Sequence, residues 1–420
     1  MKKIRIMSMV IAIVFLLVSL GVFAEGANEA TPEGDKTIVL SSRLWSTPTE
    51  QKFIIDEIIK PFEEATGYRV NFQILDDDTL LQRAELQTTT GHVSTDIVIA
   101  YNARMAEWID AGYIVDMTDT ISVWNDRTFS TTFEDTTNKN GKQYFIPVGA
   151  DVYLLLANKK ALPYLPAGAD VQNLTWAEYA EWANNVKTGE GEGKAVVTGV
   201  PMKSLVYQFG GLALSYGAGF PEINTPGAVE AWKVFASMKD AFIKGVFSVD
   251  NCTNPMLRGE SWLTVFHNAR AGQVYSSNET QYVVAPAPAG PAGIGSIAGC
   301  SGYAIMKDAP NAEGAIAFLE YITRPDIQVL LAKGTGGFIP PVQEAIEYVG
   351  NDPQDEIITK AISVLENGVV SGVPGGDFQD WGAVKQVFDD VFKDMIINGN
   401  GSIDMAMLDA ANDKLNALRK

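Results

Sequence analysis

The sequence predicts an α/β protein of two domains, and three observations lead to this fold class. The chain has 420 residues, more than a single hydrophobic core usually organises. Strand and helix patterns alternate early in the chain and do so again after Thr175, which is typical of α/β folds. The apolar stretch Gly141 to Leu165 is broken around Asp151 and then resumes. We interpret it as a strand that leaves one compact unit and enters another, although a core strand with a bulge would give the same pattern.

The first 24 residues match a cleavable secretory signal. Basic residues precede the apolar run Ile6 to Val18, and Val22-Phe23-Ala24 fits the small-residue pattern before a signal-peptidase cut. The run is too short to span a membrane comfortably. No cysteine precedes Cys252, so we expect no lipid anchor. We therefore expect residues 1–24 to be a signal peptide, residues 25–36 a flexible leader, and the mature protein to be free in the periplasm.

The charge of the chain excludes some classes of partner. The formal net charge is −19 at neutral pH, so nucleic acid and anionic lipid surfaces are poor partners. We expect a monomer that binds no nucleic acid.

The first part of the mature chain predicts the order β-α-β-α-β-α. Thr47-Pro48-Thr49-Glu50 combines a capping hydroxyl, an early proline and a glutamate, which together favour a helix start. Gly67 supplies the stop. The other predicted elements are strands at Thr37–Ser42, Tyr68–Leu75 and Asp96–Ala100 and helices at Leu80–Thr90 and Asn102–Ala111. This order is typical of a parallel sheet covered by helices on both faces.

The later part of the chain repeats the alternation. Thr175-Trp176-Ala177-Glu178 is a second capping box. The predicted strands are Ala195–Val200, Gln281–Ala285 and Tyr303–Met306, and the predicted helices are one from Thr225 to Gly245, one at Asn311–Thr323 and two between Trp381 and Ala417. We interpret the Pro- and Gly-rich segment Pro286 to Gly295 as a return to the first domain.

Few residues offer catalytic or metal chemistry. His92 and His267 are the only histidines, and there is no Gly-x-Ser-x-Gly elbow or phosphate-binding Gly-rich loop. Histidine and cysteine are too scarce for an ordinary zinc site, and Asp76-Asp77-Asp78 lacks the spacing of a calcium loop. We expect no catalytic residues, no metal and no cofactor. The possibility that two carboxylates act as a pair in glycoside hydrolysis stays open, because it depends on their separation in space, which the sequence does not give.

The two cysteines leave a question about oxidation. Cys252 and Cys300 would lie in an oxidising compartment, where a disulfide can form. Whether they pair stays open, since the sequence does not give the distance between their Cα atoms.

Aromatic residues follow predicted strand ends or stand beside glycine turns. Ligands of open α/β sheets bind outside the carboxyl ends of the strands. An aromatic face can stack on the C–H side of a sugar ring while Asp or Asn pairs with its hydroxyls. The aromatic residues placed in this way are Trp45, Tyr101, Tyr207, Phe209 and Trp381.

A family resemblance covers nearly the whole mature chain. The stretches that carry it include KPFEEATGYRVNF, STDIVIAYNARMAEWIDAGYIVDM, GKQYFIPVGADVYLLLANKKALPYL and GCSGYAIMKDAPNAEGAIAFLEYITRPD. In number, order and spacing they resemble the extracellular solute-binding proteins of sugar ABC importers, the maltose-binding-protein-like family. The resemblance implies a type II periplasmic-binding-protein clamshell that closes on a sugar and delivers it to a membrane permease.

The resemblance also places the lobes and the crossings between them. The N-terminal lobe would comprise residues 37–150 and 286–323, and the C-terminal lobe residues 151–285 and 324–420. The three interlobe crossings would fall at Ala150 to Leu155, near Tyr282 to Pro286 and near Thr323 to Ile327.

Several ligand contacts follow from the resemblance residue by residue. Asp151 matches a position whose carboxylate reaches the ligand from the hinge, and Trp381 matches a stacking aromatic. The remaining expected contacts are Trp45, Tyr101, Asn102 and Arg104 in the first lobe, His267 and Asn268 in the second, and Gly302.

The sequence departs from the family pattern, so the identity of the sugar does not transfer. Ala157 stands where the family usually has tyrosine, and Ala100 replaces a tryptophan. Another small solute, such as a phosphorylated polyol or a polyamine, is an alternative ligand. Only Arg104 and Lys203 are placed to meet a phosphate. A secreted glycoside-active enzyme is the alternative from a different class.

Overall fold

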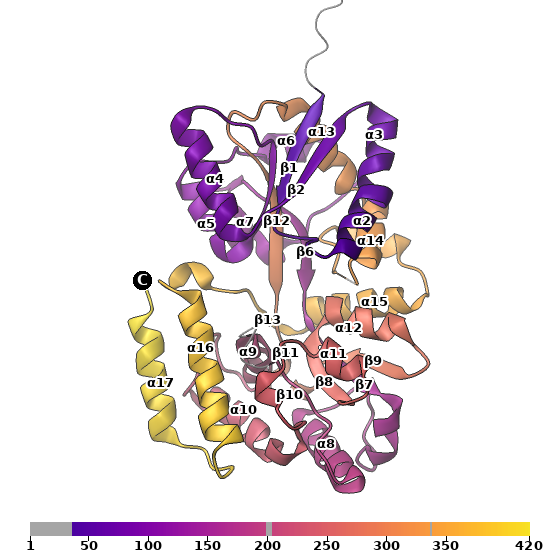
Figure 1. Ribbon diagram of the computed structural model, residues 1–420, viewed down its shortest axis with the longest axis vertical. Helices are drawn as coiled ribbons and strands as arrows, with labels where there is room; N and C mark the ends of the chain where they lie inside the picture. The colour runs from indigo at the N-terminus through magenta and orange to yellow at the C-terminus, as the bar shows by residue number, and fades with distance from the viewer. Residues whose placement is uncertain (1–35, 199–203, 337) are drawn as a thin grey trace, which may run out of the picture. The chain divides into compact units, whose positions relative to one another are not determined.

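A five-stranded mixed sheet organises the first lobe of the computed structural model (Figure 1), which describes residues 36–198, 204–336 and 338–420. The expected signal peptide, and the leader as far as residue 35, lie outside the described residues. The strand order is β2-β1-β3-β12-β6. The strands are β1 (Thr37–Ser42), β2 (Arg69–Ile74), β3 (Ile97–Tyr101), β6 (Ile146–Asp151) and β12 (Gly299–Ile305). As predicted, β1 pairs in parallel with β2 and β3, whereas β12 runs antiparallel to β3 and β6.

The two faces of this sheet belong to different cores, because successive side chains of a strand point to opposite faces. Ile97, Ile99 and Tyr303 pack with one core, and Val98 and Ala304 pack with the other. The first core is completed by helices η1 (Ile54–Ile59), α3 (Lys60–Thr66), α13 (Ala312–Ile322) and α14 (Pro325–Gly334), and the second by α4 (Asp77–Thr90) and α5 (Asn102–Asp110). Helices therefore cover both faces, as the alternating pattern predicted.

The first-lobe helices begin and end where local sequence signals place them. The Thr47 hydroxyl accepts a hydrogen bond from the Glu50 N–H at 3.2 Å, so the predicted capping box is confirmed. Gly67 ends the third helical segment in the left-handed conformation, with φ of 78°. The elements are α2 (Pro48–Phe53), π-helical η1 (Ile54–Ile59), α3 (Lys60–Thr66), α4 (Asp77–Thr90), α5 (Asn102–Asp110), α6 (Thr118–Ser122), η2 (Thr131–Phe133), α7 (Glu134–Thr137), α13 (Ala312–Ile322), α14 (Pro325–Gly334), η6 (Gln343–Tyr348) and the hairpin of β4 (Asn138–Lys139) and β5 (Lys142–Gln143).

Two small sheets organise the second lobe. One is antiparallel with order β8-β7-β9, and the other has order β10-β11-β13. The strands are β7 (Tyr153–Asn158), β8 (Leu263–His267), β9 (Tyr282–Pro286), β10 (Ala289–Gly290), β11 (Gly293–Ile297) and β13 (Val369–Ser371). The central strand β7 is fully buried, which explains its continuous apolar run.

Helices complete the core of the second lobe. The Thr175 hydroxyl accepts from the Glu178 N–H at 3.2 Å, which confirms the second predicted capping box. The elements are η3 (Lys159–Tyr164), α8 (Trp176–Glu190), α9 (Leu205–Ser215), α10 (Pro226–Ser237), η4 (Lys239–Ala241), η5 (Val246–Ser248), α11 (Thr253–Leu257), α12 (Asn268–Ser277), α15 (Pro353–Asn367), η7 (Gly375–Asp377), α16 (Trp381–Val391), π-helical η8 (Phe392–Ile397) and α17 (Met405–Ala417). In the described part of the chain, none of the helices combines the length and hydropathy needed to cross a bilayer.

Two predicted elements of this lobe differ in the structure. The strand expected at Ala195–Val200 is reduced to isolated bridges at Ala195, and its last two residues lie outside the described residues. The helix expected to reach Gly245 ends at Ser237. The chain then turns through η4, and Phe242 becomes extended to pair with Ala195. Pairing between these two segments thus replaces both the longer helix and the strand.

The chain passes between the lobes three times, and two passages lie later than predicted. The first passage is at Val152, between β6 and β7. For the second, β9 still pairs with β7 and the segment Pro286 to Gly295 leads into the β10–β11 hairpin, so the chain returns only at Ala298. For the third, Ile327 on α14 still packs in the first-lobe core. The third passage therefore follows η6 and precedes α15.

Candidate functional site

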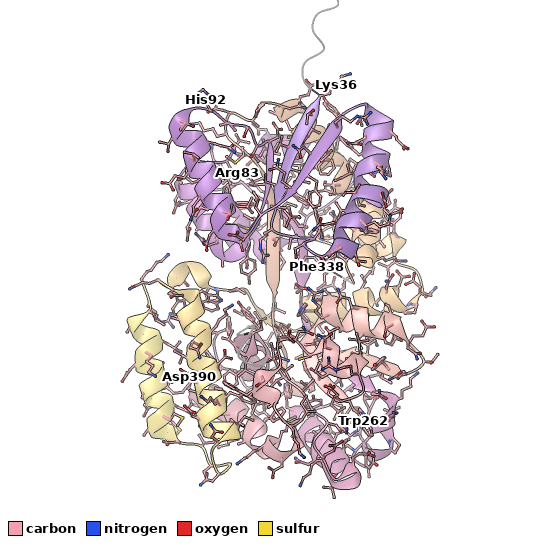
Figure 2. All side chains as sticks on the ribbon, in the orientation of Figure 1. Lys36, Arg83, His92, Trp262, Phe338 and Asp390 are labelled. Atoms are coloured by element: carbon pink, nitrogen blue, oxygen red, sulfur yellow. The ribbon has the colours of Figure 1, made fainter. Side chains whose placement is uncertain are left out.

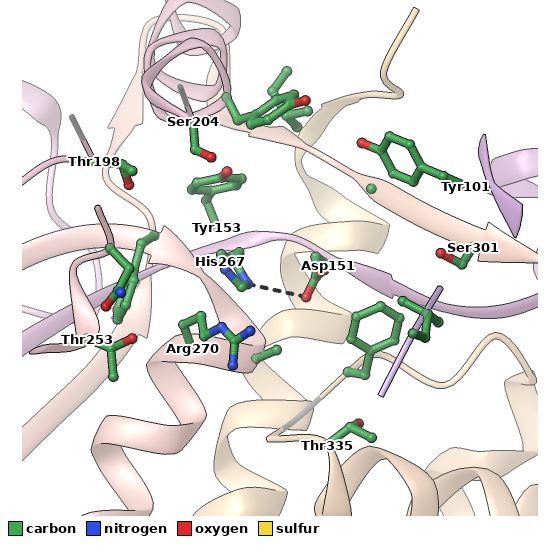
Figure 3. Close-up of a pocket in the computed structure, with 18 of the residues that line it drawn as sticks. Tyr101, Asp151, Tyr153, Thr198, Ser204, Thr253, His267, Arg270, Ser301 and Thr335 are labelled. Carbon is green, nitrogen blue, oxygen red and sulfur yellow. Dashed lines mark ion pairs between the residues drawn. The ribbon is translucent and has the colours of Figure 1, made fainter. Parts of the chain in front are cut away.

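One cavity of about 770 Å³ is lined by residues of both lobes. Its first-lobe lining comes from the loop after β1, the ends of β3 and β6, and the start of β12. Its second-lobe lining comes from β7, the end of β8 and the first turns of α9, α12 and α16. Binding at strand ends is the expected location in α/β folds. Figure 3 shows a close-up of this cavity.

Aromatic side chains form one wall of the cavity. The Trp381 indole N–H donates a hydrogen bond to the Tyr207 hydroxyl at 2.9 Å, and the two ring centroids are 6.5 Å apart. Phe220 and Phe378 pack against Trp381 with centroid distances of 6.0 and 5.5 Å. These contacts fix the orientation of the indole, and Trp381 is only partly buried and still lines the cavity.

Two tyrosines add neutral polar groups to the lining. Tyr101 ends β3, and Tyr153 begins β7 directly after the first passage. Burial raises the pKa of both phenols well above their usual range. Each hydroxyl therefore stays protonated at neutral pH and can both donate and accept a hydrogen bond.

Asp151 and His267 meet where the two lobes join. The His267 Nδ1 atom lies 3.6 Å from the Asp151 Oδ1 atom (Figure 3). Both atoms are shielded from solvent, and neither has a hydrogen-bond partner among the described residues. Buried polar atoms are nearly always paired in native proteins. A ligand hydroxyl could pair with either atom only after a movement that exposes it, since both have almost no accessible surface in this conformation.

The charged lining is partly self-compensated. Arg43 Nε lies 2.9 Å from Asp77 Oδ2, and Arg43 Nη1 donates to the Ser301 hydroxyl at 3.2 Å. Burial raises the pKa of Asp77, although Arg43 opposes the shift. Arg270 also lines the cavity.

The cavity brings together part of the predicted site. The residues that line it, from both lobes, are Trp45, Tyr101, Asp151, Tyr207, His267 and Trp381. They remain our proposed ligand contacts.

Two other predicted residues are packed away from the cavity. Phe209 is fully buried and stacks on Trp232 with ring centroids 3.9 Å apart. Gly302 leaves no room for a side chain, because a Cβ atom would lie 2.6 Å from the Met105 Cε atom. The glycine turn that singled out Phe209 in the sequence is instead part of helix α9.

Three further predicted residues support the walls of the cavity and do not line it. Asn102 is buried in the first turn of α5. Arg104 forms ion pairs with Asp78 at 2.6 Å and with Glu107 at 2.9 Å. Asn268 accepts a hydrogen bond from the Val152 N–H at 2.9 Å, so it braces the first passage.

The sequence reasoning missed several lining residues. Arg43 directly follows β1. The expectation that ligands bind outside the carboxyl ends of strands would therefore have identified it. Arg270 stands three residues after His267, in the first turn of α12, where the sequence carries no special signal. Phe338, labelled in Figure 2, covers Gly149, where a Cβ atom would lie 2.3 Å from its ring.

Cys252 and Cys300 both line the cavity as free, buried thiols. The structure therefore contains no bond between them. Burial raises the pKa of both thiols.

Comparison with known proteins identifies the family. Residues 57–362 match the model of the bacterial extracellular solute-binding protein family. Two relatives are named as binding proteins, one from Brucella abortus (strain 2308) and one from Brucella suis biovar 1 (strain 1330). Each is 24% identical to this chain over 381 residues, which covers 85% of this chain and 87% of the relative.

Solved structures share the fold. The sugar-binding protein MalE from Xanthomonas citri superposes with a TM-score of 0.72 at 17% identity, covering 91% of this chain and 96% of that protein. The cyclic alpha-maltosyl-1,6-maltose binding protein from Arthrobacter globiformis has a TM-score of 0.71 at 16% identity. UgpB from Mycobacterium tuberculosis, in complex with glycerophosphocholine, also has a TM-score of 0.71 at 16% identity. Each of these last two comparisons covers 91% of this chain and 98% of the other.

The fold is that of the two-lobed, maltose-binding-protein-like type II periplasmic binding proteins. With most of its length matched by the family model, the chain belongs to the bacterial extracellular solute-binding protein family.

Proposed function

We propose that the protein is the periplasmic substrate-binding component of an ABC importer, which captures a sugar or oligosaccharide in this cavity and delivers it to a membrane permease. One observation carries the proposal. Asp151 and His267, whose facing side-chain atoms make no hydrogen bond, line the same cavity as the Trp381–Tyr207 aromatic wall. In this proposal the protein binds its solute and does not transform it.

A sugar matches both kinds of surface. Its ring has an apolar C–H face that stacks on an aromatic side chain, and its edge carries hydroxyls that donate and accept hydrogen bonds. A cavity of about 770 Å³ falls within the size range of small-molecule sites. The volume supports a ligand of one to a few sugar rings.

Capture would proceed by a shift between conformations. Because the lining comes from both lobes, a ligand can contact both only when they are closed around it. Such a ligand stabilises the closed conformation by the difference between its affinities for the two states. The passages at Val152, Ala298 and the η6–α15 connection are the segments that would bend.

A thermal-shift screen of sugars, polyols and polyamines tests the proposal. A ligand present at roughly a hundredfold excess over its Kd stabilises the folded state by about 2.7 kcal/mol. We expect a sugar or sugar derivative to raise the unfolding midpoint and a Trp381→Ala variant to reduce the shift. If polyamines alone produced a shift, the sugar proposal would fail.

The same sample separates binding from catalysis. Oligosaccharides that stabilise the protein are incubated with it and then analysed for shortened products by chromatography. We expect every oligosaccharide to be recovered intact. Release of shorter sugars would favour a glycoside-active enzyme.

A further inference from the structure

Arg270 is a cation of the cavity without a partner. Its side chain is partly buried and extends into the cavity beside the Asp151–His267 pair (Figure 3). Among the described residues it has no ion pair within 4.0 Å, no side-chain hydrogen bond and no aromatic ring beneath it. Asp151 is therefore beyond ion-pair distance of Arg270.

The other arginine of the cavity is already engaged. Arg43 pairs with Asp77, donates to Ser301 and lies over the Tyr101 ring at 4.7 Å. Arg104, which the sequence suggested for an anion, is held outside the cavity by Asp78 and Glu107. Of the two arginines that line the cavity among the described residues, Arg270 is therefore the one that remains available to a ligand.

The start of α12 adds positive potential beside Arg270, while the carboxylates of Asp151 and Asp250 also line the cavity. Arg270 stands in the first turn of α12, whose N-terminus carries no side-chain cap. The first N–H groups of a helix lack intrahelical partners, and the helix dipole adds partial positive charge there. His267 precedes this turn, and its Nδ1 atom, which makes no hydrogen bond, lies on the same wall.

An uncompensated guanidinium in a partly desolvated cavity is unfavourable until an anion pairs with it. Carboxylate and phosphate groups match its planar fork with two parallel hydrogen bonds. We propose that the solute is an acidic sugar or polyol, and that Arg270 binds its carboxylate or phosphate while Asp151 accepts hydrogen bonds from its hydroxyls. This inference rests on the proposed function and narrows its class of solute.

Matched pairs of neutral and acidic ligands test the proposal by isothermal titration calorimetry on the mature protein. The pairs are galactose with galacturonate, glucose with glucose 6-phosphate, and glycerol with glycerol 3-phosphate. We expect an acidic member of a pair to bind at least ~10-fold more tightly than its neutral partner, as charge-assisted hydrogen bonds allow. Its affinity should fall with added salt. The pair that discriminates most identifies carboxylate or phosphate as the group recognised.

Two substitutions distinguish a specific contribution of Arg270 to binding from a general attraction between the protein and an anion. Arg270→Gln should reduce affinity for the acidic ligand by roughly 10-fold to 100-fold, remove its salt dependence and have a much smaller effect on the affinity for the neutral ligand. Arg270→Lys should restore part of the affinity, because the charge returns without the fork. Arg69→Gln is the matched control. Arg69 is 69% exposed, pairs with Glu63 and lies outside the cavity lining, so this variant should bind like the wild type.

The outcomes distinguish this inference from the proposed function. If neutral and acidic sugars bind equally well, and Arg270→Gln changes neither, Arg270 serves only to balance the charge of Asp151. The acidic-solute proposal is then overturned while the sugar proposal stands. If no member of any pair binds, both proposals are overturned. If glycerol 3-phosphate alone binds, the sugar proposal is overturned and the acidic-solute proposal stands.

Discussion

The Nδ1 atom of His267 lies 3.6 Å from the Oδ1 atom of Asp151, and both atoms lack a hydrogen-bond partner among the described residues. Asp151 ends the last first-lobe strand before the first passage, and His267 ends a strand of the second lobe. The pair therefore sits where movement of one lobe would change its geometry. In our proposal, a bound solute supplies the hydrogen bonds that these two side chains lack.

We predict that Asp151→Asn weakens solute binding by ~10-fold or more, because a hydrogen bond to a charged acceptor is replaced by one to a neutral acceptor. The free energy of unfolding should change by less than about 1 kcal/mol, since Oδ1 makes no hydrogen bond in the free protein and its contact with His267 Nδ1 is 3.6 Å long. Calorimetric titration and thermal unfolding measure the two effects. Asp119→Asn, an exposed change of equal charge, is the control and should alter neither. A large loss of stability with unchanged affinity would assign Asp151 a structural role.

Trp381→Ala should weaken sugar binding by roughly 10-fold, because the stacking face is removed. Its cost in stability should be clearly smaller than that of Trp232→Ala. Trp232 is fully buried against Phe209, and its loss should cost about 3–5 kcal/mol. Chemical denaturation of both variants gives the comparison. Equal destabilisation would make Trp381 a core residue and misplace the proposed aromatic wall.

Cys252 and Cys300 should resist alkylation in the native protein. Burial raises the pKa of both thiols, so at mildly alkaline pH the reactive thiolate is scarcer than for an exposed cysteine. Mass spectrometry after treatment with iodoacetamide should find the native protein unmodified. It should find both cysteines alkylated in denaturant without a reductant. Alkylation that requires a reductant would reveal a disulfide and contradict the structure.

Lys333 joins α14 to the start of α15 across the third passage. Its Nζ atom lies 2.8 Å from Asp355 and 2.9 Å from Asp352, and the Asp355 side chain is only 2% exposed. Lys333→Met should cost roughly 3 kcal/mol of stability, since it leaves a buried carboxylate unpaired. Lys233→Met, at an exposed pair with Glu230, should cost less than about 1 kcal/mol.

The Lys333 interaction also predicts a pH dependence. Burial lowers the pKa of Lys333, but the hydrogen bonds to Asp355 and Asp352 outweigh it, and the pKa is raised. Because the folded pKa exceeds the unfolded one, this stabilisation is fully present below the unfolded pKa, about 10.4. It is lost as the pH rises through the folded value. Denaturation curves at increasing alkaline pH should show this loss in the wild type and a smaller one in Lys333→Met. Identical slopes in the two proteins would contradict the assignment.

The sequence predicted the features that depend on local signals. The capping boxes at Thr47 and Thr175 are confirmed because the cap lies within a few residues of the helix it starts. Trp45 and Tyr101 line the cavity because ligands of open α/β sheets bind outside the carboxyl ends of the strands, and both residues follow or end such strands. The parallel pairing of β1 with β2 and β3 followed from the same alternating pattern.

Features that depend on distant packing were not predictable in this way. Phe209 resembled a pocket aromatic, but its partner Trp232 is contributed by another helix. The second passage was placed too early because nothing local shows that Pro286 to Gly295 leads into a hairpin of the second lobe. Arg270 was missed because the absence of a partner is a property of the assembled cavity.

Small-angle X-ray scattering of the protein, with and without the solute found by the thermal-shift screen, tests the central claim that a solute bound between the lobes closes them. At saturating solute we predict a smaller radius of gyration for the wild type. Asp151→Asn, at the solute concentration that saturates the wild type, should show a smaller change. An unchanged radius of gyration in the wild type, with binding confirmed calorimetrically in the same sample, would contradict the account.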